Sequence, residues 1–315
     1  MPLHYGNVTS SSNADELTHP LSPGNKLQHL YVLQANAVSI YAVGGVYPIR
    51  SITQGINSGT ALSFDSGGNL YVSNVGNNTV TVYAPGKSTV LRTIKYGLYL
   101  PLPMTFDLKG NLYVGDTGTN GVPVYAPGKS KPSRTIYEGV DQPYSLTTDK
   151  SGDLYVANRL DNTVTVYAPG KTSVLRTISE GLNQPVVVAL NHVSDLYVGN
   201  ENDVTVYPPG QSKLLRIISK GVYAPLALAF DSADNAYIAN NGYSTVTVYA
   251  PSSNKLLKTI LSGINRPSAL AFDASGNLYV ANQGNGTVTV YAPGQGAVLR
   301  SLSGLSMPLA LAFGP

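Results

Sequence analysis

One short motif, Leu-Tyr-Val or a close variant of it, recurs seven times along the 315-residue chain at intervals of 40 or 42 residues. The copies begin at Leu30, Leu70, Leu112, Leu154, Leu196, Ala236 and Leu278. Each copy lies at the same place in a longer unit, which is most regular between Pro267 and Arg300. A repeat of this length indicates an array of similar substructures, because neighbouring units must pack together to bury their apolar surface.

The repeating unit contains four short runs of strand-forming residues separated by turn residues. In the most regular copy the runs cover residues 269–272, 278–281, 287–291 and 298–302, with Gly, Pro, Asn and Asp between them. Such runs are typical of strands joined by tight turns. No stretch of helical length has a period of 3.6 residues. Each unit is therefore predicted to form a four-stranded antiparallel sheet, the blade of a β-propeller.

The phase of the repeat predicts how the ring closes. The chain enters on a second-type run (27–33) and leaves on a first-type run (308–313), with six complete units between them. The C-terminal inner strand and the three N-terminal strands would then share a seventh blade, which leaves no inner edge unpaired. The predicted fold class is all-β: a seven-bladed β-propeller with four antiparallel strands per blade, forming one domain over residues 27–315.

The most regular units resemble a known type of repeat. Leu-Tyr-Val-Ala-Asn, followed after a turn by Thr-Val-Thr-Val-Tyr-Ala-Pro-Gly, is similar to the NHL-type and YVTN-type propeller repeats of secreted bacterial proteins. The resemblance covers about residues 27–315. It implies an extracellular or periplasmic protein whose signal peptide is absent from this sequence. It does not define a ligand, because related propellers include binding modules, sensor domains, lyases and hydrolases.

Composition narrows the classes of partner. The net charge is +3 and only 12% of residues are charged, so no basic surface for nucleic acid is expected. No apolar run is long enough to insert into a membrane. Residues 1–26, rich in Ser, Asn and Pro, are predicted to be a flexible leader and lack the apolar core of a signal peptide. Cysteine is absent. A monomer is the default expectation.

Two polar positions recur once per blade and are predicted to serve turns. One ends each first run, and its members are Asp65, Asp107, Asp149, Asn191, Asp231 and Asp273. The other ends each second run, and its members are Asn74, Asp116, Asn158, Asn200, Asn240 and Asn282. A calcium site is the alternative for the carboxylates, but Asp and Asn at such places accept hydrogen bonds from nearby backbone.

A basic residue recurs in each fourth run, at Arg50, Arg92, Arg134, Arg176, Arg216, Lys258 and Arg300. We expect these charges to stand along the exposed outer edges, where they would discourage pairing with other chains. A track for anions is the alternative. Three prolines, Pro101, Pro103 and Pro123, interrupt strand runs, so the region 98–125 is predicted to be the least regular blade.

A search for catalytic groups is mostly negative. The four histidines, His4, His19, His29 and His192, include no pair with metal-ligand spacing. The residues expected to open the inner strands make an apolar mouth and are Ser58, Leu102, Tyr144, Val186, Leu226, Ser268 and Leu309. No catalytic residue, metal or cofactor is predicted, and enzymatic activity is disfavoured.

The loops between the fourth and first runs, and between the second and third, depart most from the repeat over the 96–266 region. They carry aromatic and charged residues that could stack on a ligand and orient it. The candidate ligand-binding residues are Tyr96, Tyr99, Asp141, Tyr144, Arg159, Asp161, Glu201, Tyr223, Tyr243 and Arg266. Ordinary drift of surface loops is the alternative explanation.

The leading functional hypothesis is a non-enzymatic binding propeller that recognises a carbohydrate or a peptide or protein partner on this loop face. Two alternatives stay open. One is a propeller lyase or hydrolase whose site residues are not recognisable in the sequence. The other is a structural module for assembly at the cell surface.

Overall fold

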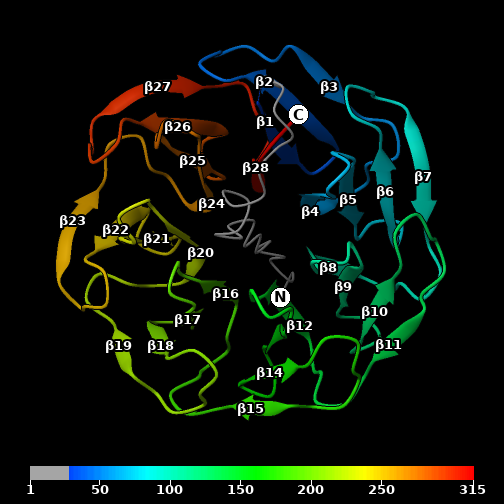
Figure 1. Cartoon of the computed structure of the whole chain (residues 1–315). Helices are drawn as coiled ribbons and strands as arrows, with labels where there is room; N and C mark the ends of the chain where they lie inside the picture. The colour runs from blue at the N-terminus through cyan, green and yellow to red at the C-terminus, as the bar shows by residue number, and fades with distance from the viewer. Residues whose placement is uncertain (1–27) are drawn as a thin grey trace.

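The computed structural model describes residues 28–315, which fold into seven four-stranded antiparallel sheets arranged as blades around a central axis (Figure 1). The predicted seven-bladed propeller is confirmed, and the predicted leader lies outside the described residues. Within residues 28–315 no helix is long and apolar enough to span a bilayer.

Each blade places its first strand at the axis and its fourth at the circumference. From the axis outward, the first three blades are β4 (Gly59–Phe64), β5 (Leu70–Asn74), β6 (Thr79–Tyr83) and β7 (Val90–Ile94); β8 (Pro101–Phe106), β9 (Leu112–Asp116), β10 (Val122–Tyr125) and β11 (Arg134–Ile136); and β12 (Pro143–Thr148), β13 (Leu154–Asn158), β14 (Thr163–Tyr167) and β15 (Arg176–Ile178). The next three are β16 (Val187–Leu190), β17 (Leu196–Gly199), β18 (Val204–Tyr207) and β19 (Arg216–Ile218); β20 (Pro225–Phe230), β21 (Ala236–Asn240), β22 (Thr245–Tyr249) and β23 (Leu256–Ile260); and β24 (Pro267–Phe272), β25 (Leu278–Asn282), β26 (Thr287–Tyr291) and β27 (Val298–Leu302).

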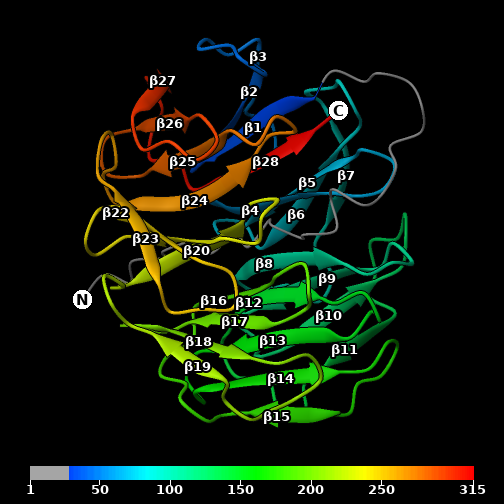
Figure 2. The same ribbon diagram turned by 60° about the vertical axis from the view of Figure 1, so that its left-hand side comes forward.

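The seventh blade joins the two ends of the described chain. Its strands are β28 (Ala310–Gly314), β1 (His29–Gln34), β2 (Ala37–Ala42) and β3 (Arg50–Ile52), and β28 pairs with β1 along five residues. β28 also packs against β24 of the adjoining blade (Figure 2). The Tyr31 hydroxyl donates a hydrogen bond to the Pro315 carbonyl at 2.8 Å. Closure therefore occurs as the phase of the repeat predicts.

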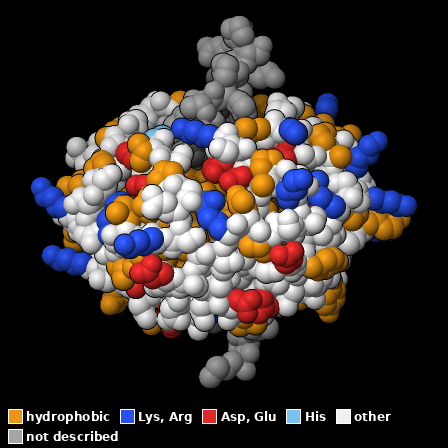
Figure 3. Space-filling view, turned by 60° about the horizontal axis from the view of Figure 1, so that its bottom comes forward, with side chains coloured by type: hydrophobic (Ala, Val, Ile, Leu, Met, Phe, Trp, Pro, Cys, Tyr) orange, Lys and Arg blue, Asp and Glu red, His pale blue; other side chains and the backbone are white. Residues whose placement is uncertain are grey.

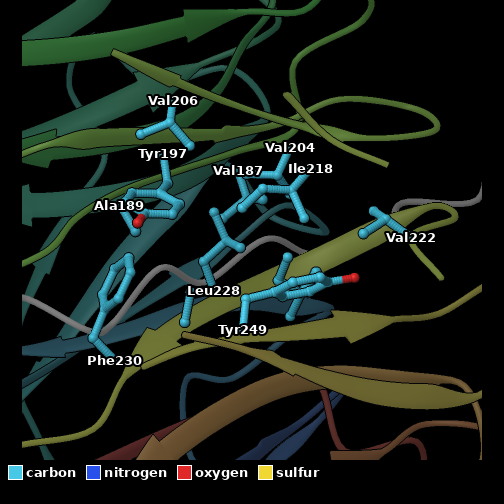
Figure 4. Close-up of a cluster of buried hydrophobic side chains, with 12 residues drawn as sticks. Val187, Ala189, Tyr197, Val204, Val206, Ile218, Val222, Leu228, Phe230 and Tyr249 are labelled. Atoms are coloured by element: carbon cyan, nitrogen blue, oxygen red, sulfur yellow. The ribbon is translucent and has the colours of Figure 1, made fainter. Parts of the chain in front are cut away.

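The core lies between the blades, because the second and third strands bury both of their faces. One such cluster joins the β16–β19 and β20–β23 blades through Val187, Tyr197, Leu228, Phe230 and neighbouring side chains (Figure 4). The rings of Tyr197 and Phe230 meet edge to face with centroids 4.9 Å apart. Because both faces pack on other sheets, the alternating partners in these strands are Thr and Tyr instead of Lys and Glu.

The outer-strand basic residues differ from their prediction. All seven are half-buried. Five of the arginines donate from Nη2 to the second-strand tyrosine of their own blade, as Arg92 does to the Tyr71 hydroxyl at 2.9 Å. In the best-formed cases that hydroxyl lies beside the turn aspartate, with Tyr71 Oη 3.3 Å from Asp65 Oδ2. In four of these blades the guanidinium therefore joins a chain of hydrogen bonds that ends on a carboxylate. The expectation of exposed edge charges is wrong for all five arginines.

The two recurring polar positions have separate roles. Asp65 accepts hydrogen bonds from the backbone of Gly67 and Asn69, which confirms the turn interpretation. Asn74 differs, because it is fully buried at the end of β5 and accepts from the backbone of Asn57 in the preceding loop. The second position therefore ties two loops together instead of forming a self-contained turn.

The blade with the interrupting prolines is irregular where the sequence predicts it. β9 and β10 have only two registered pairs, and the register of β8 slips between Pro101 and Met104. In this blade the buried Asn is replaced by Asp116, whose Oδ1 accepts from Thr119. In the β4–β7 blade the side chain of Asn74 donates a hydrogen bond to the hydroxyl of Thr81 on the third strand. Pro123 takes the place of that threonine on β10. Loss of that hydroxyl explains why an acceptor-only side chain suits position 116.

Candidate functional site

We define the loop face as the side formed by the fourth-to-first and second-to-third loops. Backbone hydrogen bonds join the two kinds of loop, for example from Gly118 to Tyr99 at 2.9 Å and from Arg159 to Gln142 at 3.2 Å. The loop face includes residues 53–58, 95–100, 137–142, 179–186, 219–224, 261–266 and 303–309, together with 35–36, 75–78, 117–121, 159–162, 200–203, 241–244 and 283–286. All ten candidate residues lie on it or at its inner margin.

Exposed tyrosines lie on glycines at two places on this face. A Cβ at Gly118 would fall within 2.3 Å of the Tyr99 ring, and a Cβ at Gly242 within 2.2 Å of the Tyr223 ring. Tyr243 extends the second place, with its ring centroid 5.1 Å from that of Tyr223. The glycines therefore let the tyrosines approach the loop backbone closely, and this supporting role is not evident from the sequence.

Tyr144 and Arg159 come together at the inner end of the β12–β15 blade. The Arg159 guanidinium lies over the Tyr144 ring at 5.0 Å from its centroid. Arg159 Nη2 also donates to Oε1 of Gln184, in the loop leading to the next blade, at 3.2 Å. Tyr144, Val186 and Leu226 are partly buried and pack against the same apolar cluster. Sequence reasoning did not identify Gln184, whose contact depends on how two loops approach each other.

The carboxyl groups of Asp141 and Asp161 form a second pairing in the same blade. Burial and the nearby Asp161 charge raise the pKa of Asp141, while a hydrogen bond from Asn120 acts in the opposite direction. Asn120 Nδ2 lies 2.8 Å from Asp141 Oδ1. No cation contributes to this balance. Asp161 and Arg159, two residues apart in one loop, therefore have different partners.

The other three candidates lie apart from these groups. The ring of Tyr96 lies near Lys95 and Lys131, with Nζ atoms 5.8 and 5.4 Å from its centroid. Glu201 is exposed and accepts a long hydrogen bond of 3.5 Å from Asn183. Arg266 is exposed and has a positive φ of 48°. The ten residues thus share one face but form local groups in separate blades.

The sequence-based prediction for one residue of the apolar mouth, Ser58, is wrong. Ser58 lies in a loop with φ of 49°, and the first strand begins at Gly59. Thr60 takes the position equivalent to Leu102, and its hydroxyl hydrogen is shared among Ser73 and the backbone of the next blade. Gly59 pairs with Asn74 as Pro143 pairs with Asn158, so Gly59 takes the place of the proline that begins the first strand in other blades, and the mouth residue follows it.

Charges on the rest of the surface are dispersed. In the view of Figure 3, Lys and Arg protrude around the circumference, and Asp and Glu occur in small separate groups. On the face opposite the loop face, His192 Nδ1 lies 3.0 Å from Asp234 Oδ1 and links two blades. Over residues 28–315, no three His, Asp or Glu side chains gather as a group of metal ligands.

Comparison with known proteins supports the architecture. The sequence matches no protein family and no curated protein. A structure described as streptogramin B lyase superposes with a TM-score of 0.70 at 9% identity, covering 80% of this chain and 86% of that chain. The computationally designed Ika8 protein superposes with a TM-score of 0.69 at 16% identity, covering 92% of this chain and 94% of that chain. At such low identity these similarities show the propeller fold alone.

Proposed function

We propose that the protein is a non-enzymatic binding propeller of the NHL or YVTN type. It acts outside the cytoplasm as a monomer and recognises a carbohydrate or peptide through the loop face. The repeat motif supports the assignment to an exported family. The gathering of exposed aromatic and charged side chains on one face supports binding there, because rings supply contact area and charges supply orientation.

The observation that carries this proposal is the pair formed by Tyr223 and Tyr243. Their side chains are 42% and 58% exposed although the rings contact each other. Among the residues that the structure describes, neither hydroxyl has a hydrogen-bond partner. An exposed pair of rings with unused hydroxyls can stack on a sugar ring or on an apolar side chain and hydrogen-bond to its edge.

Screening of the full chain on glycan and peptide arrays, followed by calorimetry of the best ligand, tests this proposal. Tyr243→Ala should weaken binding about tenfold or more, because stacking on one ring contributes about 0.5–1.5 kcal/mol and a hydrogen bond from the hydroxyl adds about as much. Tyr243→Phe keeps the ring and should lose only the part of the affinity that the hydroxyl contributes. Tyr47→Ala removes a tyrosine that is 81% exposed on the opposite face and serves as the control. Equal binding by the wild type and Tyr243→Ala would refute a role for the pair.

The glycine under the pair provides an independent test. Gly242→Ala should displace the Tyr223 ring, because the new Cβ would overlap it. Affinity should fall while the melting temperature changes little, since the ring lies at the surface. Gly296→Ala is the matched control, because the nearest atom to its new Cβ is 3.9 Å away. Undiminished binding by Gly242→Ala would show that the affinity for the ligand does not depend on the position of the Tyr223 ring.

A structural role in assembly is a second candidate, favoured by the outer strands. A large apolar residue precedes the basic residue and is exposed in six of the seven blades, at Ile49, Leu91, Leu175, Leu215, Leu257 and Leu299. Apolar side chains beside an unpaired strand edge favour association with another protein. Analytical ultracentrifugation decides this candidate, since a strictly monomeric protein at high concentration would exclude assembly between copies.

A further inference from the structure

Arg159 occupies a loop-face position that reaches toward the neighbouring blade. It directly follows the buried Asn158, and the equivalent Asn241 donates a hydrogen bond to Pro267 of its next blade at 3.2 Å. The residues at this position in six blades are Val75, Thr117, Arg159, Glu201, Asn241 and Gln283. Arg159 is the single cation in this set, so it introduces a charge that the repeat itself does not require.

The charge of Arg159 is not neutralised by the described part of the protein. The ion pairs found in residues 28–315 are His192 with Asp234 and Arg216 with Asp195. Four outer-strand arginines, Arg92, Arg134, Arg176 and Arg300, reach a carboxylate through a tyrosine hydroxyl, but Arg159 donates only to the neutral amide of Gln184. A half-buried cation with one neutral partner has unused capacity for an anion.

The geometry of the guanidinium suits a carboxylate. The ring of Tyr144 holds the guanidinium at 5.0 Å, closer than in the five outer-strand pairs, which range from 5.5 to 5.9 Å. Stacking restricts the guanidinium plane and leaves the N–H donors pointing out along its edge. Nη2 uses one donor on Gln184, and Nη1 has no hydrogen-bond partner in the described chain. Nε is buried and unpartnered, as it is in the six outer-strand arginines, so the fork open to a ligand is formed by Nη1 and Nη2. A fixed fork of this kind binds a carboxylate with two parallel hydrogen bonds.

The Tyr144 ring under this fork packs against an apolar cluster. Val186 directly precedes β16 and Leu226 is the second residue of β20, in the next two blades, and both pack with Tyr144 against the same cluster. A ligand that places its carboxylate on Arg159 would therefore meet aliphatic surface next to it. A peptide whose last residue is apolar has both groups at adjacent atoms, whereas an acidic sugar surrounds its carboxylate with hydroxyls. The surroundings favour the peptide.

We propose that Arg159, positioned by Tyr144 and Gln184, binds the C-terminal carboxylate of a peptide ligand whose terminal side chain packs toward Val186 and Leu226. This inference rests on the proposed binding function and names the ligand class for one part of the loop face. It assigns Tyr144 and Gln184 as positioning residues and Arg159 as the residue that touches the ligand.

Three small molecules separate the contribution of the carboxylate charge from that of the apolar side chain. N-acetyl-leucine has the carboxylate and the apolar side chain, N-acetyl-leucinamide lacks the charge, and glucuronate has the charge on a polar ring. Each is titrated into the full chain while the Nε–Hε resonances of labelled arginines are recorded. N-acetyl-leucine should shift the Arg159 signal and bind at least about tenfold more tightly than the other two, because a charge-assisted pair contributes more than a neutral hydrogen bond.

Variants of Arg159 complete the test. Arg159→Gln should lose the response to N-acetyl-leucine, and Arg159→Lys should retain a weakened response because it keeps the charge without the fork. Lys171→Gln removes a cation from the opposite face of the same blade and should bind normally. Melting temperatures confirm that each variant is folded.

Three results would overturn this inference. They are equal binding of the acid and the amide, unchanged binding by Arg159→Gln, and preference for glucuronate. If any of them occurs while Tyr243→Ala still weakens binding of an array ligand, the proposed function stands and the carboxylate site alone is wrong.

Discussion

Raising the pH above about 10 should destabilise this protein, because buried tyrosines hold its blades together. Burial raises the pKa of two tyrosines in every blade: Tyr31, Tyr41, Tyr71, Tyr83, Tyr113, Tyr125, Tyr155, Tyr167, Tyr197, Tyr207, Tyr237, Tyr249, Tyr279 and Tyr291. Above about pH 10 the unfolded chain therefore binds fewer protons than the folded protein. The free energy of unfolding is unaffected by these groups below that pH and falls as the pH rises toward their folded-state pKa values.

The loss in the free energy of unfolding can be calculated for three of these tyrosines. Burial raises the pKa of Tyr113, Tyr155 and Tyr207 to about 12. A group whose pKa is about 10 in the unfolded chain and about 12 in the folded protein lowers the free energy of unfolding by about 1.4 kcal/mol at about pH 11. Three such groups lower it by about 4 kcal/mol, against a total of about 5–15 kcal/mol for a typical domain. The other eleven act in the same direction.

The assay is denaturation by guanidinium chloride, followed by circular dichroism, at several values between about pH 8 and 11. Tyr207→Phe is the diagnostic variant, because the Tyr207 hydroxyl donates to the Glu180 carbonyl at 2.6 Å. Near pH 8 the variant should be less stable by about 1 kcal/mol. Near pH 11 the wild type should have lost about 1.4 kcal/mol more than the variant, which has one fewer tyrosine to ionise, so the variant should become the more stable of the two by about 0.4 kcal/mol.

Two results would refute this reasoning. One is a denaturation midpoint that is the same near pH 8 and pH 11. The other is tyrosinate absorbance that passes half of its final amplitude while the circular dichroism stays native, since 14 of the 22 tyrosines should ionise only on unfolding. Either result would mean that solvent reaches the hydroxyls without opening the blades.

Three further predictions concern stability and are checked by denaturation at neutral pH. Deleting residues 307–315 removes β28 with its buried Leu and Ala side chains. The free energy of unfolding should fall by several kcal/mol, at about 1.5–3 kcal/mol per buried leucine. An unchanged denaturation midpoint would contradict ring closure. Lys258→Arg should stabilise by about 0.5–1.5 kcal/mol, because Tyr237 lacks the arginine bond of other blades; a loss of stability would argue against the hydrogen-bond chain. Asp116→Asn should cost about 1–2 kcal/mol alone and less beside Pro123→Thr, and additive effects would show that the two positions are independent.

The fold could be predicted from the sequence because the same pattern of strand and turn residues occurs seven times. Seven copies of one pattern locate every strand, and the phase of the pattern locates the joint at β28. The role of the outer arginines was not predicted, because it depends on register. Arg92 pairs with Val82, which pairs with Tyr71, so the side chains of Arg92 and Tyr71 lie on one face of the sheet. A basic residue on an outer strand is visible in sequence, but the direction of its side chain requires that register.

The candidate site was predicted at the level of the loop and not of the contact. Every candidate lies on the expected face, since strand order determines which loops share a side. The association of Arg159 with Tyr144 and Gln184 joins three loop or strand segments, and the support of Tyr223 by Gly242 depends on a close approach. Such contacts follow from loop conformations that no periodic pattern encodes.

The two faces differ in how their loops are held, and this difference explains why variation is concentrated on one of them. On the opposite face the side chains themselves make the turns, as Asp65 does by accepting from Gly67 and Asn69. On the loop face the anchor is a backbone N–H that donates to the buried Asn or Asp of the same blade, in the residues Asn57, Tyr99, Asp141, Asn183, Tyr223 and Asn265. Since any residue except proline supplies that N–H, the side chain at this position is free to change without loss of the loop. A scaffold anchored in this way can place an aromatic ring, an amide or a carboxylate at the same point of successive blades, so the loop face is where binding specificity can arise without destabilising the propeller.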